Sequence, residues 1–272
     1  MKASTSVLQA LGIAVAAAVL TACGGQHDAP PQISSLPAGV THFSTTTYAA
    51  AAASPAASAT SAAAQDLLTA GLGKSGLQNT GAAASYLDPL NPTAAELRRA
   101  AIQANYRAIL DSSANGGYGS LYGPNIDNAG GNTLGEGLIP GKEYLGYIDD
   151  GSGMKTVVIA VQIPSNFDVD NPCVVAGPSS GSRGVYGAIA TASEWGLKHK
   201  CAVALTDAGK GTGLYDPTDD SVNKIDGTRA TRTAAGALSF FAVNIADNVR
   251  ALFNALYPNR LAIKHAHSQM NP

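Results

Sequence analysis

Charged residues are scarce in this sequence. Only 13% of its 272 residues are Asp, Glu, Lys or Arg, about half of the roughly 25% that is usual in soluble domains. The 17 basic and 19 acidic residues nearly balance, so the chain lacks the basic surface that nucleic-acid binding requires. We therefore expect no nucleic-acid partner.

Large core-forming side chains are also few. Aromatic residues make up 6% of the chain, and much of its 45% hydrophobic content is alanine, as in the tract 49–53. The length nevertheless allows one or two domains with a substantial core.

The N-terminus contains an apolar run that is too short to span a bilayer. Met1-Lys2 supplies a positive start, and Val7 to Leu20 form an apolar segment of the length typical of an export signal. Leu20-Thr-Ala-Cys23 resembles a bacterial lipobox, in which the cysteine is acylated after cleavage. We predict an export signal over 1–23, with either a lipid anchor at Cys23 or an ordinary cleavage site. The predicted location is extracellular or periplasmic.

A flexible linker is predicted over residues 24–64, because this segment is rich in Ala, Ser, Thr and Pro and poor in large apolar residues. Beyond it lie two further cysteines, Cys173 and Cys201, each of which opens an apolar run. An exported protein can hold them either as a disulfide or as two buried thiols. Their spacing is not that of a zinc site.

Residues 65–272 alternate between strand and helix patterns. Apolar runs at 155–163, 173–176 and 201–207 predict strands, and helices are expected after Asn91-Pro92 and over 187–199 and 244–256. The strand runs are continuously apolar, which favours an α/β fold: a mostly parallel sheet covered on both faces, like an incomplete α/β-hydrolase domain. Residues 115–141, rich in Gly, Asn and Tyr, predict a long ordered loop.

The helix after Pro92 has one candidate buried face. Leu97, Ala101, Ala104 and Ala108 mark an apolar stripe at helical spacing. Ile102, Tyr106 and Ile109 lie beside this stripe, and the predicted polar face carries Glu96, Arg98 and Arg99.

The loop after residue 176 is the leading candidate site, because ligands of open α/β sheets bind beyond the carboxyl ends of strands. Gly177-Pro-Ser179-Ser180-Gly181 fits the G-x-S-x-G pattern of a nucleophile elbow. Pro178 precedes the serine, however, and the expected order of Ser, acid and His is not completed downstream. We favour an oxyanion or substrate loop made of Gly177, Ser179, Ser180 and Gly181; the alternatives are a Ser179 nucleophile or a turn without chemistry.

Other clusters give weaker indications. Asp207 to Gly213 is glycine-rich but lacks a phosphate-binding pattern, so it is interpreted as a rim of the cleft. Asp216, Asp219 and Asp220 are interpreted as a solvated turn, and His265 with His267 lacks the carboxylate of a metal site. Trp195 is expected in the core and Tyr186 in the cleft wall. No metal or cofactor is predicted.

Long segments of the chain resemble the D-(-)-3-hydroxybutyrate oligomer hydrolase family. They are the runs 177–198 and 201–213, the loop 115–121, the turn 146–151, and Lys264-His-Ala-His-Ser-Gln269. Members are exported bacterial serine esterases that cleave short 3-hydroxybutyrate oligomers downstream of polyhydroxybutyrate depolymerases. The resemblance implies a serine, a histidine and an acid that act through an acyl-enzyme.

One departure from the family concerns the nucleophile. The family's serine lies in a Ser-Asn-Gly-Gly segment that follows the region matched here, and no such segment occurs in this sequence. The resemblance therefore assigns no catalytic residue to this chain and indicates the N-terminal portion of an enzyme, inactive by itself. The alternative is a non-catalytic exported lipoprotein or ligand-binding domain.

Overall fold

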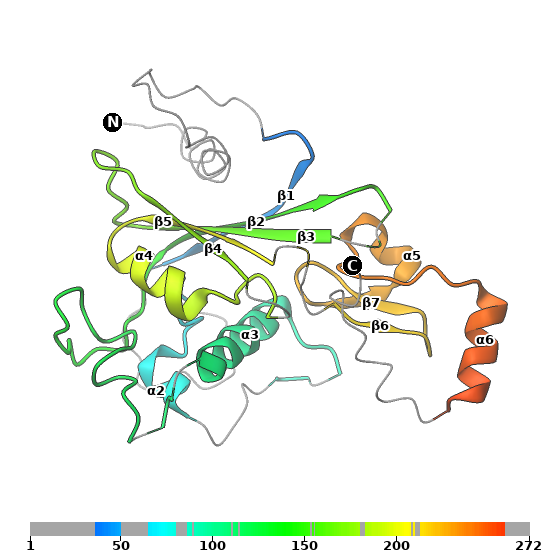
Figure 1. Cartoon of the computed structure of the whole chain (residues 1–272), viewed down its shortest axis with the longest axis horizontal. Helices are drawn as coiled ribbons and strands as arrows, with labels where there is room; N and C mark the ends of the chain where they lie inside the picture. The colour runs from blue at the N-terminus through cyan, green and yellow to red at the C-terminus, as the bar shows by residue number, and fades with distance from the viewer. Residues whose placement is uncertain are drawn as a thin grey trace.

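The computed structural model describes residues 36–49, 65–79, 86–88, 90–109, 111–113, 115–152, 154, 156–179, 183–207, 209 and 213–258. The predicted export signal with Cys23, and also Ser180, Gly181, His265 and His267, lie outside these residues. Figure 1 shows a large sheet, a layer of helices beside it, and a smaller C-terminal unit.

The large sheet has five strands in the order β1-β2-β3-β5-β4. Three neighbouring pairs are antiparallel and only β4 and β5 run parallel, so the prediction of a mostly parallel sheet is wrong. One reason is that β2 and β3 are joined by a connection too short for a parallel crossover. The strands are β1 Val40–Tyr48, β2 Gly141–Asp149, β3 Thr156–Pro164, β4 Val174–Pro178 and β5 Ala202–Thr206.

Strand β1 occupies residues that the sequence assigned to the flexible linker 24–64, so that assignment is wrong for residues 40–48. The strand reads Val-Thr-His-Phe-Ser-Thr-Thr-Thr-Tyr, and its β-branched and aromatic residues suit an extended, half-buried edge. It pairs with β2 from Val40 opposite Ile148 to Tyr48 opposite Gly141.

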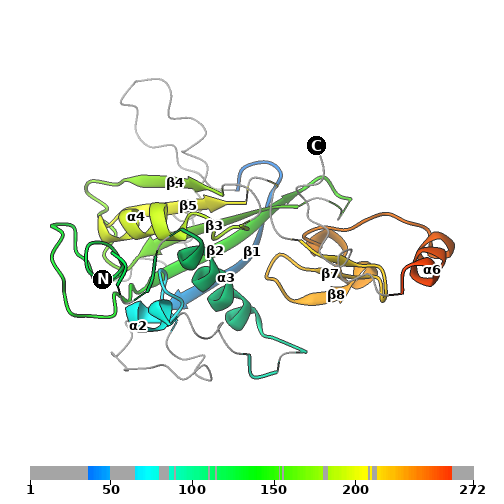
Figure 2. The same cartoon turned by 60° about the horizontal axis from the view of Figure 1, so that its bottom comes forward.

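The helices packed on this sheet lie on one face. They are α3, Ala94–Ile109, and a π-helical turn η2, Ile189–Ser193, that continues into α4, Glu194–Lys198. Glu143 of β2 and Gln162 of β3 are register partners. Glu143 is bound by Arg98 of α3, and Gln162 accepts a hydrogen bond from Ser193 of η2. Within the described residues the predicted cover on both faces is therefore not found (Figure 2).

Helix α3 buries a different face from the predicted one. Ile102 and Tyr106 are fully buried and Arg98 is nearly so, whereas Ala104 and Ala108 are exposed. A stripe of alanines gains little free energy from burial, so the larger side chains decide which face turns inward.

The C-terminal unit consists of a small antiparallel sheet and short helices. Main-chain bonds attach it to the large sheet, because the N–H of Thr156 donates to Phe240 and the N–H of Ala242 donates to Met154. Asp216 is buried and Asp220 is paired with Arg232 at 3.1 Å, so the predicted solvated turn is partly a packed one. The elements of this unit are β6 Tyr215–Asp216, β7 Ser221–Asn223, β8 Arg229–Thr231, α5 Arg232–Ala235, the 3-10 turn η3 Gly236–Leu238 and α6 Asp247–Leu256. The remaining helix of the chain's described part, α2 Gly73–Gln78, precedes α3.

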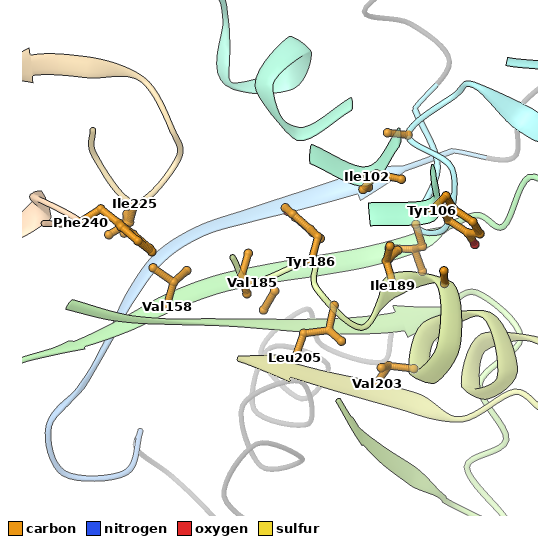
Figure 3. Close-up of a cluster of buried hydrophobic side chains, with 14 of the residues drawn as sticks. Ile102, Tyr106, Val158, Val185, Tyr186, Ile189, Val203, Leu205, Ile225 and Phe240 are labelled. Atoms are coloured by element: carbon orange, nitrogen blue, oxygen red, sulfur yellow. The ribbon is translucent and has the colours of Figure 1, made fainter. Parts of the chain in front are cut away.

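The core is continuous between the two units. Figure 3 shows Ile225 and Phe240 at one end, Ile102 and Tyr106 at the other, and Tyr186 between them. Among the described residues no helix is long and apolar enough to cross a membrane.

Candidate functional site at the carboxyl ends of β4 and β5

Strands β4 and β5 end side by side, as the sequence predicted. Pro178 is the register partner of Thr206, so the next residues, Ser179 and Asp207, leave the sheet as neighbours. The main-chain N–H of Ser179 donates to the carbonyl oxygen of Thr206 at 2.7 Å, which extends the pairing by one residue. That N–H group is therefore not available to stabilise an oxyanion.

The side chain of Ser179 is buried and lies against Gly187, two residues before η2. It is 7% exposed, and a Cβ atom added at Gly187 would overlap its Oγ. The described histidines are His42, in β1, and His199, which lies before β5 and so at the opposite end of that strand. No described histidine is therefore placed to activate Ser179 as a nucleophile.

Gly177 has a packing role. A Cβ atom there would lie 2.7 Å from Cβ of Ala192 and 2.8 Å from Cδ2 of Leu205. The glycine lets η2 approach the β4–β5 pair closely, which is one reason for glycine beside a crossover helix. Ser180 and Gly181, the other members of the predicted loop, lie outside the described residues.

Asp207 is the most unusual carboxyl group at this edge. Its side chain is fully buried, and Oδ1 accepts hydrogen bonds from the N–H groups of Val158 and Gly209. Oδ2 has no hydrogen-bond partner. Burial raises the pKa of Asp207 to about 6. The sequence analysis placed Asp207 only in the rim of the cleft. An acidic residue directly after an apolar strand was the sequence feature that could have indicated a buried carboxyl group.

A disulfide joins the other end of the same strand pair. Cys173 and Cys201 precede β4 and β5 and are bonded, with their Cα atoms 4.8 Å apart. The sequence left a disulfide or two thiols open, and the structure has the disulfide. It lies at the opposite end of the strand pair from Ser179 and Asp207.

A cavity of about 830 Å³ lies beside residues 183–186, which follow β4 in the sequence. Its walls come from β1, β2, α3, the segment 183–186 and the segment 223–227. This volume is within the range of about 300–1,000 Å³ that is typical of small-molecule sites. The lining includes the apolar side chains of Phe43, Leu97, Leu145, Val185, Ile225 and Phe240.

Arg98 forms a saturated polar network in the cavity wall. Its five N–H groups are matched by five hydrogen bonds, two of them to Glu143 at 2.9 and 3.0 Å. The guanidinium also lies 4.6 Å from the ring centre of Tyr48 and 5.4 Å from that of Tyr186. Burial would raise the pKa of Glu143, but the charge and hydrogen bonds of Arg98 hold it below its usual range.

The outcomes for the two aromatic residues differ. Tyr186 lines the cavity and donates to Glu143 at 2.9 Å, which confirms its predicted place in the cleft wall. Trp195, predicted in the core, is 56% exposed and stacks on His199 with ring centres 4.0 Å apart. That prediction is wrong, because Glu194, Gly196 and Leu197 are the residues of α4 that turn inward.

In the part of the chain that the structure describes, no three His, Cys, Asp or Glu side chains gather as a metal ion would require. Two pairs of charged side chains in the cavity wall are bound to each other: Arg98 with Glu143, and Lys224 with Asp226.

Comparison with known proteins identifies a single family. A family model described as 3HB-oligomer hydrolase (3HBOH) matches residues 19–272. The D-(-)-3-hydroxybutyrate oligomer hydrolase of Paraburkholderia xenovorans (strain LB400) is 52% identical over 256 residues, which are 93% of this chain and 35% of that protein. The protein of the same name from Polaromonas naphthalenivorans (strain CJ2) is 50% identical over 270 residues, 99% of this chain and 36% of that protein.

This chain thus spans about a third of the length of the curated relatives that it matches. No solved structure gave a significant match.

Proposed function

The chain belongs to the 3HB-oligomer hydrolase family, and from this premise we propose that the full-length protein hydrolyses 3-hydroxybutyrate oligomers to monomers. The reaction follows the serine esterase route: a hydroxyl attacks the ester carbonyl, the alcohol leaves, and water releases the acid from the acyl-enzyme. The nucleophile is a serine outside the residues of this chain.

The proposed contribution of this chain is the loop after β4. In α/β-hydrolases one oxyanion N–H comes from a loop that follows a strand other than the nucleophile's strand. Among the described strands β4 has only β5 as a neighbour, so a further parallel strand at its free edge would bring a nucleophile beside this loop. Because the N–H of Ser179 is bound to Thr206, the donors are N–H groups after Ser179.

We also propose that the protein is exported, with the signal over residues 1–23 and a lipid anchor at Cys23. The support is the apolar segment and the lipobox-like residues Leu20 to Cys23. The disulfide agrees with an oxidising compartment.

A test of the reaction uses the full-length protein and 3-hydroxybutyrate dimer and trimer, with release of the monomer as the measurement. We expect Ser179→Ala to keep kcat within about tenfold of the wild type, because Ser179 is buried and no described histidine is near it. Replacement of the serine in the family's Ser-Asn-Gly-Gly segment by alanine is the control, and should cost about a million-fold. Equal losses in the two variants would refute the proposed role of the loop.

A second candidate function is that of an exported ligand-binding protein without catalysis. The observation that favours it is the cavity of about 830 Å³, which this chain forms from its own residues. Oligomer binding by the full-length protein with no release of monomer would support this alternative over the esterase.

A further inference from the structure

The charges in the wall of the cavity are balanced except at one residue. Three cations line it: Arg98, Lys224 and Arg183. Arg98 is bound to Glu143 at 2.9 Å, and Lys224 lies 3.9 Å from Asp226. Both of these carboxylates also line the cavity. The third cation therefore gives the lining an excess positive charge.

Arg183 has no partner for its guanidinium among the described residues. It forms no ion pair, and its Nη1 is shielded from solvent without a hydrogen-bond partner. Arg183 Nε and Nη2 are not among the enclosed, unpaired atoms, and no described residue binds them, so these N–H groups are the ones that can donate to an acceptor in the cavity. A planar carboxylate fits a guanidinium with two parallel hydrogen bonds.

The backbone of Arg183 is fixed in place. The side-chain amide of Asn105, in α3, donates to the carbonyl oxygen of Arg183 at 3.2 Å. Val185 and Tyr186, which follow, are buried in the core between the two units (Figure 3). The guanidinium is thus carried by the segment 183–186, which is held to α3 by a hydrogen bond to its main chain and to the core by its next side chains.

The chemistry of the cavity therefore combines one unpaired cation with apolar walls. We propose that the cavity binds the carboxylate end of a short hydroxyacid oligoester, with Arg183 as the residue that recognises the carboxylate. The methyl-bearing ester units lie against Phe43, Leu97 and Ile225. This inference rests on the proposed function, from which it takes the oligomer as ligand, and it adds the end that is recognised.

The test compares two ligands of equal length: the 3-hydroxybutyrate trimer as free acid and its methyl ester, which lacks the negative charge. In the full-length protein we expect Arg183→Gln to lower kcat/KM for the free acid by about 10- to 100-fold, the range for a hydrogen bond to a charged group. The value for the methyl ester should change by less than about threefold, and Arg183→Lys should recover part of the loss for the acid.

Lys224→Gln is the matched control, since it removes a cation of the same cavity that already has a carboxylate partner. It should affect acid and ester alike. Thermal melts of each variant establish that the protein is folded. If Arg183→Gln lowers both substrates by the same factor, or if the wild type shows no preference for the acid, the carboxylate role of Arg183 is refuted.

The proposed function can fail separately. If the wild type releases no monomer, equilibrium binding of the same two ligands replaces the kinetic measurement. Binding of the acid that is lost in Arg183→Gln would then support the carboxylate site without the esterase. No difference in binding between acid and ester would refute the site itself.

Discussion

At the scale of single residues, the side chain of Asp207, directly after the end of β5, is hydrogen-bonded to the main chain of the neighbouring strand. Its Oδ1 accepts from Val158 of the neighbouring strand β3, at 3.1 Å. The carboxyl group is enclosed, and its Oδ2 finds no donor. Ionisation therefore places a charge where solvation is poor, and the fold is least compatible with the charged form.

This arrangement predicts how stability depends on pH. Burial raises the pKa of Asp207 to about 6, so the folded state holds this proton more tightly than the unfolded state does. The contribution of Asp207 is most favourable below about pH 4 and is lost as pH rises to about 6. Relative to Asp207→Asn, the wild type should lose about 3 kcal/mol between pH 4 and pH 7, measured by urea unfolding.

Asp168→Asn is the control with the opposite sign. The N–H of Asn171 lowers the pKa of Asp168, so this carboxylate stabilises the fold above its unfolded pKa, and that stability is lost as pH falls below about 4. For each variant, the measured quantity is the change with pH of the free energy of unfolding, wild type minus variant. If this quantity changed in the same direction for Asp207→Asn as for Asp168→Asn, the raised pKa of Asp207 would be refuted.

Arg98 and Glu143 form a pair in which each residue depends on the other. Both side chains are less than 9% exposed. Arg98→Met should lower the free energy of unfolding by about 3–5 kcal/mol, because it leaves the Glu143 carboxylate buried without its cation. Adding Glu143→Gln should restore part of the loss, and the double-mutant cycle measures the coupling.

The partly exposed pair of Arg232 and Asp220 offers a comparison at a similar distance, 3.1 Å. Arg232→Met should cost less than Arg98→Met, since solvent compensates the remaining carboxylate. Equal costs in the two variants would mean that burial does not determine the effect.

At the scale of elements, the β4–β5 pair is fixed at both ends. The disulfide between Cys173 and Cys201 closes one end, and the N–H of Ser179 with the carbonyl of Thr206 continues the pairing at the other. Between them Gly177 and Gly196 allow the crossover helix to lie close to the strands. The loop proposed to face the ester therefore starts from a strand pair whose two ends are both fixed.

Removal of the disulfide should lower the stability of the protein at the β4–β5 pair. The two cysteines are 28 residues apart in sequence, and a closed loop of that length corresponds to about 3–4 kcal/mol in the chain-entropy model. Replacement of both cysteines by alanine should lower the urea midpoint accordingly. Wild type treated with a thiol reductant should match the double variant, and an unchanged midpoint in both would show that the bond adds no stability.

Helix prediction succeeded for position and failed for orientation. The segments after Pro92, at 187–199 and at 244–256 contain α3, η2 with α4, and α6. Periodicity located them because apolar residues recur at helical spacing. It misjudged which face of α3 is buried, since Arg98 enters the interior with Glu143, and a carboxylate on a distant strand leaves no mark in the local sequence.

At the scale of the whole molecule, apolar surface remains open to solvent. Helix α6 buries none of its residues and lies beyond the small sheet, away from the large one (Figure 1). Val249, Leu252 and Leu256 are 50%, 60% and 63% exposed and follow helical spacing on one face. Exposed apolar stripes of this kind promote association.

We therefore predict that the 272-residue chain self-associates through α6. Leu252→Gln combined with Leu256→Gln should shift sedimentation toward the monomer without lowering the melting temperature, because neither side chain is buried. Leu90→Gln, at an 88% exposed residue outside α6, is the control and should leave association unchanged. A monomeric wild-type chain would contradict this prediction.

The sequence alone determined the α/β class, the place of the candidate loop and the family, because strand runs, glycine positions and long shared segments are local in the chain. Only the tertiary structure decided the direction of the strands, the pairing of Arg98 with Glu143, the burial of Asp207 and the unpaired guanidinium of Arg183. Each of these depends on residues distant in sequence meeting in space, where burial sets the energy of a charge and local pattern carries no record of the partner.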